Sequence, residues 1–133
     1  MLEASENPYT QIIAHPTGRL VLRRDPFDFD MGKVLDAAAE QGVAMECNAY
    51  PDRLDLRDVH LRMAKQRGVK IAISTDAHAT QHFPFMKYGV ATARRGWLEK
   101  KDVINTLPLK EFVAALRPKP HRAAAKAPRR KSA

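Results

Sequence analysis

The chain has 133 residues, of which 44% are hydrophobic and 29% are charged, a composition typical of one globular domain and not of a disordered chain. No stretch approaches the roughly 18 consecutive apolar residues of a membrane span, and the first residues lack the layout of a secretory signal. The single cysteine excludes an internal disulfide, so we expect a cytoplasmic protein with no membrane partner.

The positive charge is concentrated at one end of the chain. The formal net charge is +8, and residues 118–133 carry six Lys or Arg and no acidic residue. These residues are rich in Pro and Ala and show no apolar period, so we predict a folded portion over residues 1–117 and a basic disordered tail over residues 118–133. Such a tail either attracts nucleic acid through its phosphates or serves only as a solubilising extension.

The first predicted elements are a strand and a helix. Residues 10–16, "TQIIAHP", form a short apolar run that ends at His15. Residues 30–42 have the period of an amphipathic helix, with Asp30 as N-cap and Gly42 as the C-terminal stop. The apolar residues of this helix that recur at helical spacing are Met31, Val34, Leu35 and Ala38.

The same alternation continues along the chain. Residues 43–49 and 69–75 are predicted strands, and residues 55–68 between them are a predicted helix that ends at Gly68. Two more helices are predicted over residues 84–97 and 108–117. The inward face of the helix over 55–68 is expected to carry Leu56, Val59 and Met63, and one face of the last helix carries Leu109, Phe112, Val113 and Leu116.

Strands that alternate with helices over short connections form parallel sheets with right-handed crossovers. The carboxyl ends of parallel strands lie at one edge of the sheet, where α/β proteins bind ligands. The sequence places polar side chains at each of these ends. They are His15, the pair Glu46 and Asn48, and Asp76 with His78.

Two imidazoles and a carboxylate suit Zn²⁺, Mn²⁺ or Fe²⁺ better than Ca²⁺. Two other interpretations of the spacing between Asp76 and His78 stay open: Asp76 caps the next helix, or His78 is a hydrogen-bonded loop histidine. His15 at a second strand end favours the metal. Ligand type alone also allows a mononuclear iron oxygenase, which the parallel α/β pattern disfavours.

Four segments carry a family resemblance: "IIAHPTGRL" (12–20), "ECNAYPDRLDL" (46–56), "VKIAISTDAH" (69–78) and "FMKYGVATARRGWLEKKDVINT" (85–106). Together they resemble the C-terminal part of the PHP (polymerase and histidinol phosphatase) domain, most closely that of bacterial family X DNA polymerases. The resemblance runs in order from about residue 6 to residue 117.

The resemblance implies a distorted β/α barrel with two or three zinc or manganese ions in its mouth, and hydrolysis of phosphoesters. In family X polymerases it implies a 3′ to 5′ exonuclease with DNA as partner and a role in DNA repair. His15, Asp76 and His78 match the family's metal ligands, and Asp76 would be a catalytic ligand that can bridge two ions. Arg19 and Arg53 lie in family motifs and are expected to contact substrate phosphate.

The sequence also departs from the family. It has no His-x-His motif, and three ligands cannot hold two or three ions, because a catalytic zinc takes at least three protein ligands. About three parallel strands would form a partial barrel, incomplete on its own, with two unpaired edges. We therefore expect an inactive portion of a longer protein: a truncated product, an internal start at Met1, or half of a split enzyme completed by a separate chain.

The missing ligands leave open whether this chain is an enzyme. The resemblance favours a fragment of a metal-dependent phosphoesterase that acts on DNA ends. One alternative is a phosphatase of small esters, like histidinol phosphatase. The other is a non-catalytic remnant that binds nucleic acid weakly.

Overall fold

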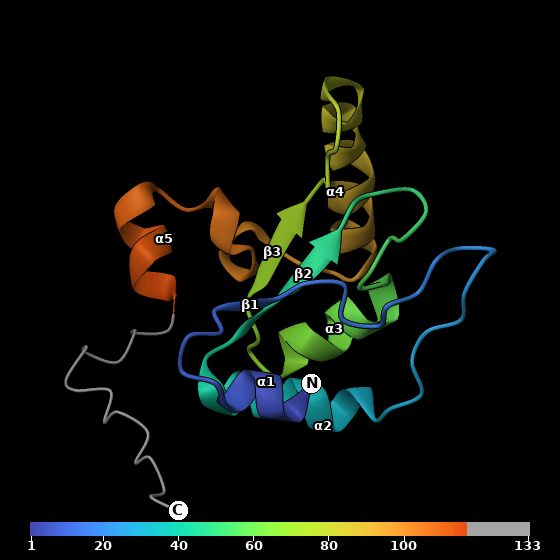
Figure 1. Ribbon diagram of the computed structural model, residues 1–133. Coiled ribbons are helices and arrows are strands. Elements are labelled where there is room, and N and C mark those ends of the chain that lie inside the picture. The colour runs from blue at the N-terminus through green and yellow to red at the C-terminus, as the bar shows by residue number, and fades with distance from the viewer. Residues whose placement is uncertain (117–133) are drawn as a thin grey trace, which may run out of the picture.

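The computed structural model describes residues 1–116, so the predicted tail over 118–133 lies outside the described residues. Among the described helices, none combines the length and the apolar character needed to cross a membrane. In chain order the elements are α1 (Leu2–Glu6), β1 (Ile12–Ile13), α2 (Met31–Gln41), β2 (Ala44–Asn48), α3 (Asp58–Gln66), β3 (Ile71–Ser74), the 3-10 helix η1 (Thr80–Phe85), α4 (Met86–Arg95), the 3-10 helices η2 (Lys100–Asp102) and η3 (Ile104–Thr106), and α5 (Leu109–Ala115) (Figure 1).

The three strands form one parallel sheet in the order β1-β2-β3. Met45 in the central strand pairs with Ile13 of β1 and with Ile71 of β3. The predicted α/β class with parallel strands is therefore confirmed. Within residues 1–116 the sheet is open, with its strands running toward a common edge.

The strand β1 is only two residues long, because the chain leaves β2 at His15, whose φ is +48°. Beyond this point a later segment lies beside β2. The backbone N–H of Asn48 donates to the Asp55 carbonyl at 2.5 Å, and that of Leu56 donates to the Glu46 carbonyl at 3.2 Å. This return of the chain brings residues 49–56 next to the loop that follows β1.

The outer edge of β3 is covered, contrary to the expectation of two unpaired edges. The Asn105 side chain accepts the N–H of Ile73 at 3.0 Å and donates to the carbonyl of Ile73 at 2.8 Å. Val103 forms a parallel bridge with Ile71. An amide side chain can replace a strand here because it offers both donor and acceptor groups.

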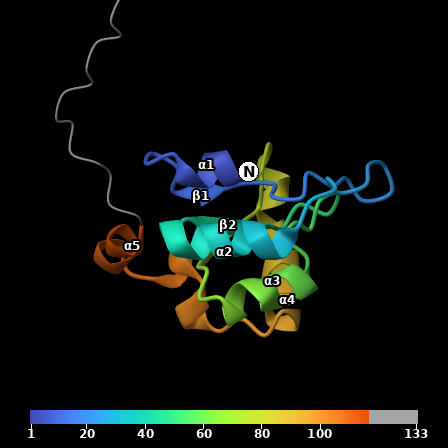
Figure 2. The same cartoon turned by 90° about the horizontal axis from the view of Figure 1, so that it is seen from below.

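The helices α2, α3 and α4 pack in series, with α1 against α2 (Figure 2). α2 follows its prediction: the Asp30 carboxylate accepts the N–H of Lys33, and Gly42 ends the helix at a φ of +66°, a conformation that glycine adopts readily. The core between these helices and the sheet is aliphatic. Its members buried to 2% exposure or less include Leu35, Ala38, Val43, Met45, Cys47, Leu56, Leu61, Ala64 and Ile71.

Of the residues predicted to face inward from the helix over 55–68, Leu56 and Met63 pack in or against the core and Val59 was wrong, and the predicted apolar face of α5 is exposed at Leu109 and Val113. In α3, Val59 is 51% exposed, whereas Leu61 and Ala64 are buried. The helix begins only at Asp58, so Leu56 is buried from the preceding loop and does not fix the phase of the helix. In α5, Leu109 is 78% exposed, because this helix lies beside the sheet, beyond β3 (Figure 1), and contacts mainly η3.

Candidate functional site

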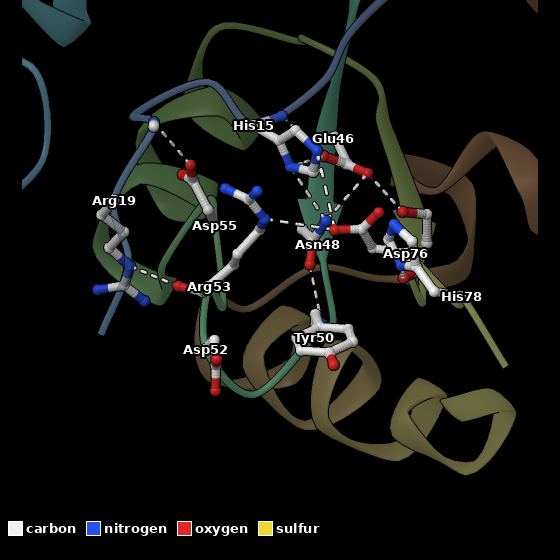
Figure 3. A network of polar contacts seen from close by, with 12 residues as sticks. His15, Arg19, Glu46, Asn48, Tyr50, Asp52, Arg53, Asp55, Asp76 and His78 are labelled. Atoms are coloured by element: carbon white, nitrogen blue, oxygen red, sulfur yellow. Dashed lines mark hydrogen bonds and ion pairs between the residues drawn. The ribbon is translucent and has the colours of Figure 1, made fainter. Parts of the chain in front are cut away.

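The predicted site residues gather at the carboxyl ends of the three strands (Figure 3). His15 follows β1, Glu46 and Asn48 lie in the second half of β2, and Asp76 follows β3. His15 and Asp76 both have left-handed backbones, with φ of +48° and +53°. Left-handed backbone is uncommon for residues other than glycine and concentrates at functional sites.

The His15 and Asp76 side chains point toward one another. The Nε2 atom of His15 lies 3.8 Å from Oδ2 of Asp76, and both side chains are partly open to solvent. On the other side of the ring, Nδ1 of His15 lies 3.3 Å from Oε2 of Glu46. An imidazole whose Nδ1 bonds a carboxylate presents its Nε2 lone pair to a metal ion, the arrangement common around metal-binding histidines.

Glu46 is the buried centre of this arrangement, with only 7% of the residue exposed. Its Oε2 accepts the backbone N–H of His15 at 2.7 Å, and its Oε1 accepts the hydroxyl of Ser74. One carboxylate therefore joins the loop after β1 to the end of β3. The sequence placed the pair Glu46 and Asn48 at this strand end, and the side chains of both contact His15.

Asn48 is compatible with two tautomers of His15. Its Oδ1 accepts the N–H of Tyr50 at 2.8 Å, so its amide group faces Nδ1 of His15 at 3.2 Å and Oε1 of Glu46 at 3.4 Å. If Nδ1 accepts from Asn48, Nε2 carries the proton and faces Asp76. If Nδ1 donates to Glu46, Nε2 is free for a cation.

The positively charged guanidinium of Arg53 lies beside the Asp76 carboxylate. Its Nε lies 3.3 Å from Oδ2 of Asp76, the same oxygen that faces His15. Arg19 holds the loop of Arg53, because its Nε donates to the Arg53 carbonyl at 2.7 Å and its Nη2 donates to the Leu54 carbonyl. Two of the three guanidinium nitrogens of Arg19 are therefore bonded to backbone.

His78 is exposed and lies just beyond Asp76. Its Nδ1 lies 2.7 Å from the Asp76 carbonyl, a bond in which Nδ1 carries the proton and Nε2 keeps its lone pair. The backbone N–H of His78 donates to Nδ1 of His82 at 3.2 Å. Asp76 does not cap the next described helix, since η1 begins at Thr80 without a side-chain cap.

Asp55, which the sequence analysis did not single out, is fully buried behind the site. Its Oδ2 accepts the N–H groups of Thr17 at 2.9 Å and Gly18 at 3.1 Å. Burial raises the pKa of this carboxyl, although hydrogen bonds from Thr17 and the charge of Arg19 oppose the shift. In the sequence, Asp55 stands between two leucines, which hints at burial. Periodicity alone does not show which groups such a buried carboxylate would bind.

Arg53, Asp76 and His78 border an open cavity of about 280 Å³. Within residues 1–116, no three His, Cys, Asp or Glu side chains are grouped closely enough to form a ready metal site. The donor types nevertheless fit a divalent cation: one carboxylate oxygen that already faces a guanidinium, and two imidazoles whose Nδ1 atoms have hydrogen-bond partners. The cavity is lined by Leu20, Tyr50, Asp52, Arg53, Asp76 and His78.

The cavity separates Arg19 from the other predicted site residues, because Arg19 lines a different cavity together with residues 20–26. Arg53, Asp76 and His78 line the first cavity together, and His15 contacts Asp76 at its border. Cys47 is fully buried in the core, where it packs as a small hydrophobic residue, and burial raises the pKa of its thiol to about 12.

Comparison with known proteins identifies the relatives of this chain, although no family model matches it. It is 45% identical over 114 residues to the DNA polymerase/3′-5′ exonuclease PolX of Bacillus subtilis (strain 168), a match that covers 86% of this chain and 20% of PolX. It is 29% identical over 112 residues to a probable phosphatase of Thermoanaerobacter sp. (strain X514), covering 80% of this chain and 43% of that protein. A probable phosphatase of Caldanaerobacter subterraneus subsp. tengcongensis is 31% identical over 84 residues, covering 59% of this chain and 31% of that protein.

The chain thus spans about a fifth of PolX and less than half of these phosphatases. The level of identity to PolX confirms the resemblance that the four sequence segments predicted, and the phosphatases fit the same relation. This chain is therefore homologous to a segment of the DNA polymerase/3′-5′ exonuclease PolX.

Proposed function

We propose that His15, Asp76 and His78 are ligands of a metal-dependent phosphoesterase centre that acts on DNA ends as a 3′ to 5′ exonuclease. The observation that supports it best is the approach of His15 Nε2 to Asp76 Oδ2 at 3.8 Å, from two strands that are not neighbours in the sheet. The Nδ1 atoms of both histidines have hydrogen-bond partners, as ligand histidines do.

Zinc or manganese suits two imidazoles and a carboxylate. A bound ion would supply Lewis acidity for a water molecule and for the phosphoryl oxygens. Two or three ions need more ligands than these three residues offer. We therefore propose that the open sheet is part of a barrel of the PHP type, whose other ligands come from residues outside those described or from a separate chain. On its own, the described portion would be inactive.

In this proposal Arg53 pairs with Asp76 when no metal is bound and binds the substrate phosphate when a metal is present. In the structure its guanidinium neutralises Asp76 at 3.3 Å. A divalent cation on Asp76 would take over that neutralisation, and the guanidinium would then be free to bind a phosphate oxygen. Arg19 would keep the Arg53 loop in place through its backbone hydrogen bonds, with one nitrogen left for a phosphate.

A second candidate function is hydrolysis of a small phosphate ester. It is favoured by the relatives named as probable phosphatases. It uses the same ligands, so the two functions differ in what surrounds the phosphate. A non-catalytic remnant with weak nucleic-acid affinity is the remaining alternative, and it predicts no tightly held ion.

Metal binding to the complete chain tests the proposal. Titration with Mn²⁺ and Zn²⁺, followed by calorimetry and by competition with a chelator, is expected to show saturable binding that Asp76→Asn weakens at least tenfold. Asp52→Asn is the matched control, because Asp52 lines the same cavity but pairs with Arg23 and is no proposed ligand. Equal affinities of Asp76→Asn and the unmodified chain would refute the assignment.

A further inference from the structure

The cavity beside the proposed ligands has an aromatic side chain in its wall, Tyr50. We propose that Tyr50 stacks against the nucleobase of the terminal nucleotide, and that this side chain makes the site prefer a nucleotide to an aliphatic phosphate ester. This inference rests on the proposed function, because it assumes that the phosphate lies at Arg53 and Asp76.

Both the backbone and the ring of Tyr50 are held in place by neighbouring residues. Its backbone N–H donates to the Asn48 side chain at 2.8 Å, which itself belongs to the His15 network. The ring makes edge-to-face contacts with His82 at 5.2 Å and with Phe85 at 5.3 Å between centroids. His82 and Phe85 stack on each other at 5.2 Å. A ring fixed by such contacts binds a ligand with little further loss of conformational entropy.

The cavity has two chemically distinct parts. Arg53, Asp76 and His78 offer charge and metal-ligand groups, whereas Leu20 and Tyr50 offer apolar surface. A ligand that carries both a phosphate and a flat ring would use both parts, and a short aliphatic phosphate would use only the first. The volume of about 280 Å³ is just below the usual range of small-molecule sites, roughly 300 to 1,000 Å³, so a small ligand such as a single nucleotide is expected.

Tyr50 packs against η1 and still keeps part of its surface open to solvent. It contributes to the wall of the cavity that two of the proposed ligands, Asp76 and His78, also line. Its ring also contacts His78 edge-on, at 6.4 Å between centroids. The aromatic surface and the metal-ligand group are therefore neighbours.

The test compares dAMP with 2-deoxyribose 5-phosphate, which lacks only the base. Dissociation constants are measured by NMR titration of the complete chain, in Mn²⁺ and in chelator. We expect dAMP to bind about 5- to 150-fold more tightly, the usual effect of stacking a base on an aromatic side chain. Tyr50→Leu is expected to remove this preference, and Tyr50→Phe to keep it.

The control is Tyr9→Ala, since Tyr9 is 62% exposed and outside the cavity lining; it is expected to leave both constants unchanged. Equal binding of the two ligands to the unmodified chain, an unchanged preference in Tyr50→Leu, or no saturable binding of either ligand would overturn the inference. The metal proposal fails separately: if Asp76→Asn leaves Mn²⁺ affinity unchanged while Tyr50→Leu loses the base preference, the stacking site stands without the metal centre.

Discussion

Replacement of Glu46 by glutamine tests whether the polar cluster has a structural role. Among the donors that the Glu46 carboxylate accepts, which include the Asn48 amide at 3.4 Å, the two closest come from different elements: the His15 N–H at 2.7 Å and the Ser74 hydroxyl. A glutamine of the same shape has one acceptor oxygen, and its NH₂ group would face the other donor. One partly buried donor is then left unpaired, which costs about 1–3 kcal/mol.

A loss of about 2 kcal/mol is a large part of the 5–15 kcal/mol that stabilises a typical domain. With a denaturant slope of about 1.5 kcal/mol per molar urea, it lowers the unfolding midpoint by roughly 1.3 M. The measurement is urea unfolding of the complete chain, followed by circular dichroism. Glu46→Ala removes both acceptor atoms, so it is expected to cost more than Glu46→Gln.

A double-mutant cycle separates this account from a general loss of packing. Ser74→Ala removes one of the two donors, so the single acceptor oxygen of the substituted side chain can then serve His15 alone. Glu46→Gln should therefore cost at least about 0.5 kcal/mol less in the Ser74→Ala background, the size of coupling typical of residues in one network. Additive costs, or a cost of Glu46→Gln below about 0.5 kcal/mol, would refute the reasoning.

Three other predictions concern the interior. Burial raises the pKa of the Asp55 carboxyl above its ordinary value of 3.8, so the folded state binds this proton more tightly than the unfolded chain. The free energy of unfolding, compared with that of Asp55→Asn, should therefore fall as pH rises from about 3.8 through the raised pKa. A difference in urea midpoints that does not change with pH would contradict this. Because burial raises the pKa of Cys47 to about 12, its labelling by iodoacetamide at pH 8 should proceed only through unfolding, and native-state labelling as fast as that of denatured protein would contradict it. Gly89→Ala should destabilise by about 1–3 kcal/mol through overpacking, since a Cβ there would lie 2.6 Å from Ile73 and 2.8 Å from Ala49. Helix propensity alone predicts a gain of about 1 kcal/mol instead. Thermal unfolding measures the difference, with Gly32→Ala as the comparison, because a Cβ at Gly32 would come no closer than 3.1 Å to another side chain.

Local signals in the sequence were sufficient for α2. Asp30 accepts the Lys33 N–H and Gly42 has the left-handed φ of a helix end, as the cap residues predicted. These signals depend only on neighbours a few residues away. α3 lacks a capping side chain at its start, so its beginning was not marked, and the predicted inward position of Val59 was wrong for that reason.

The parallel topology was sufficient to bring His15 and Asp76 to one edge, because the end of every strand in such a sheet has the same direction. It did not predict the position of Arg53. The contact between Arg53 and Asp76 depends on the return of the chain beside β2 at Asp55 and Leu56. That return is possible only because β1 ends after two residues, and no local pattern in "TQIIAHP" marks so early an end.

The backbone at the site gives a reason to regard these contacts as one functional arrangement. His15, Leu54 and Asp76 all have left-handed backbones, with φ of +48°, +45° and +53°, and each such residue costs about 1–3 kcal/mol. In each case a polar side chain bonds the backbone of the strained residue. Glu46 accepts the N–H of His15, Arg19 donates to the carbonyl of Leu54, and the His78 ring bonds the carbonyl of Asp76.

An ordinary loop relieves such strain by placing glycine at the strained position, as this chain does at Gly18, Gly42 and Gly68. At His15 and Asp76 glycine would relieve the backbone but remove the imidazole and the carboxylate that face each other at 3.8 Å. The turn at His15 takes the chain out of β1 and directs Nε2 toward Asp76, so the strain and the contact have the same cause. Left-handed backbone alone does not mark the site, because the exposed residues Leu22 and Trp97 also have a φ of +62°. What distinguishes His15 and Asp76 is that their strained backbones bring two polar side chains face to face, as expected of a binding site.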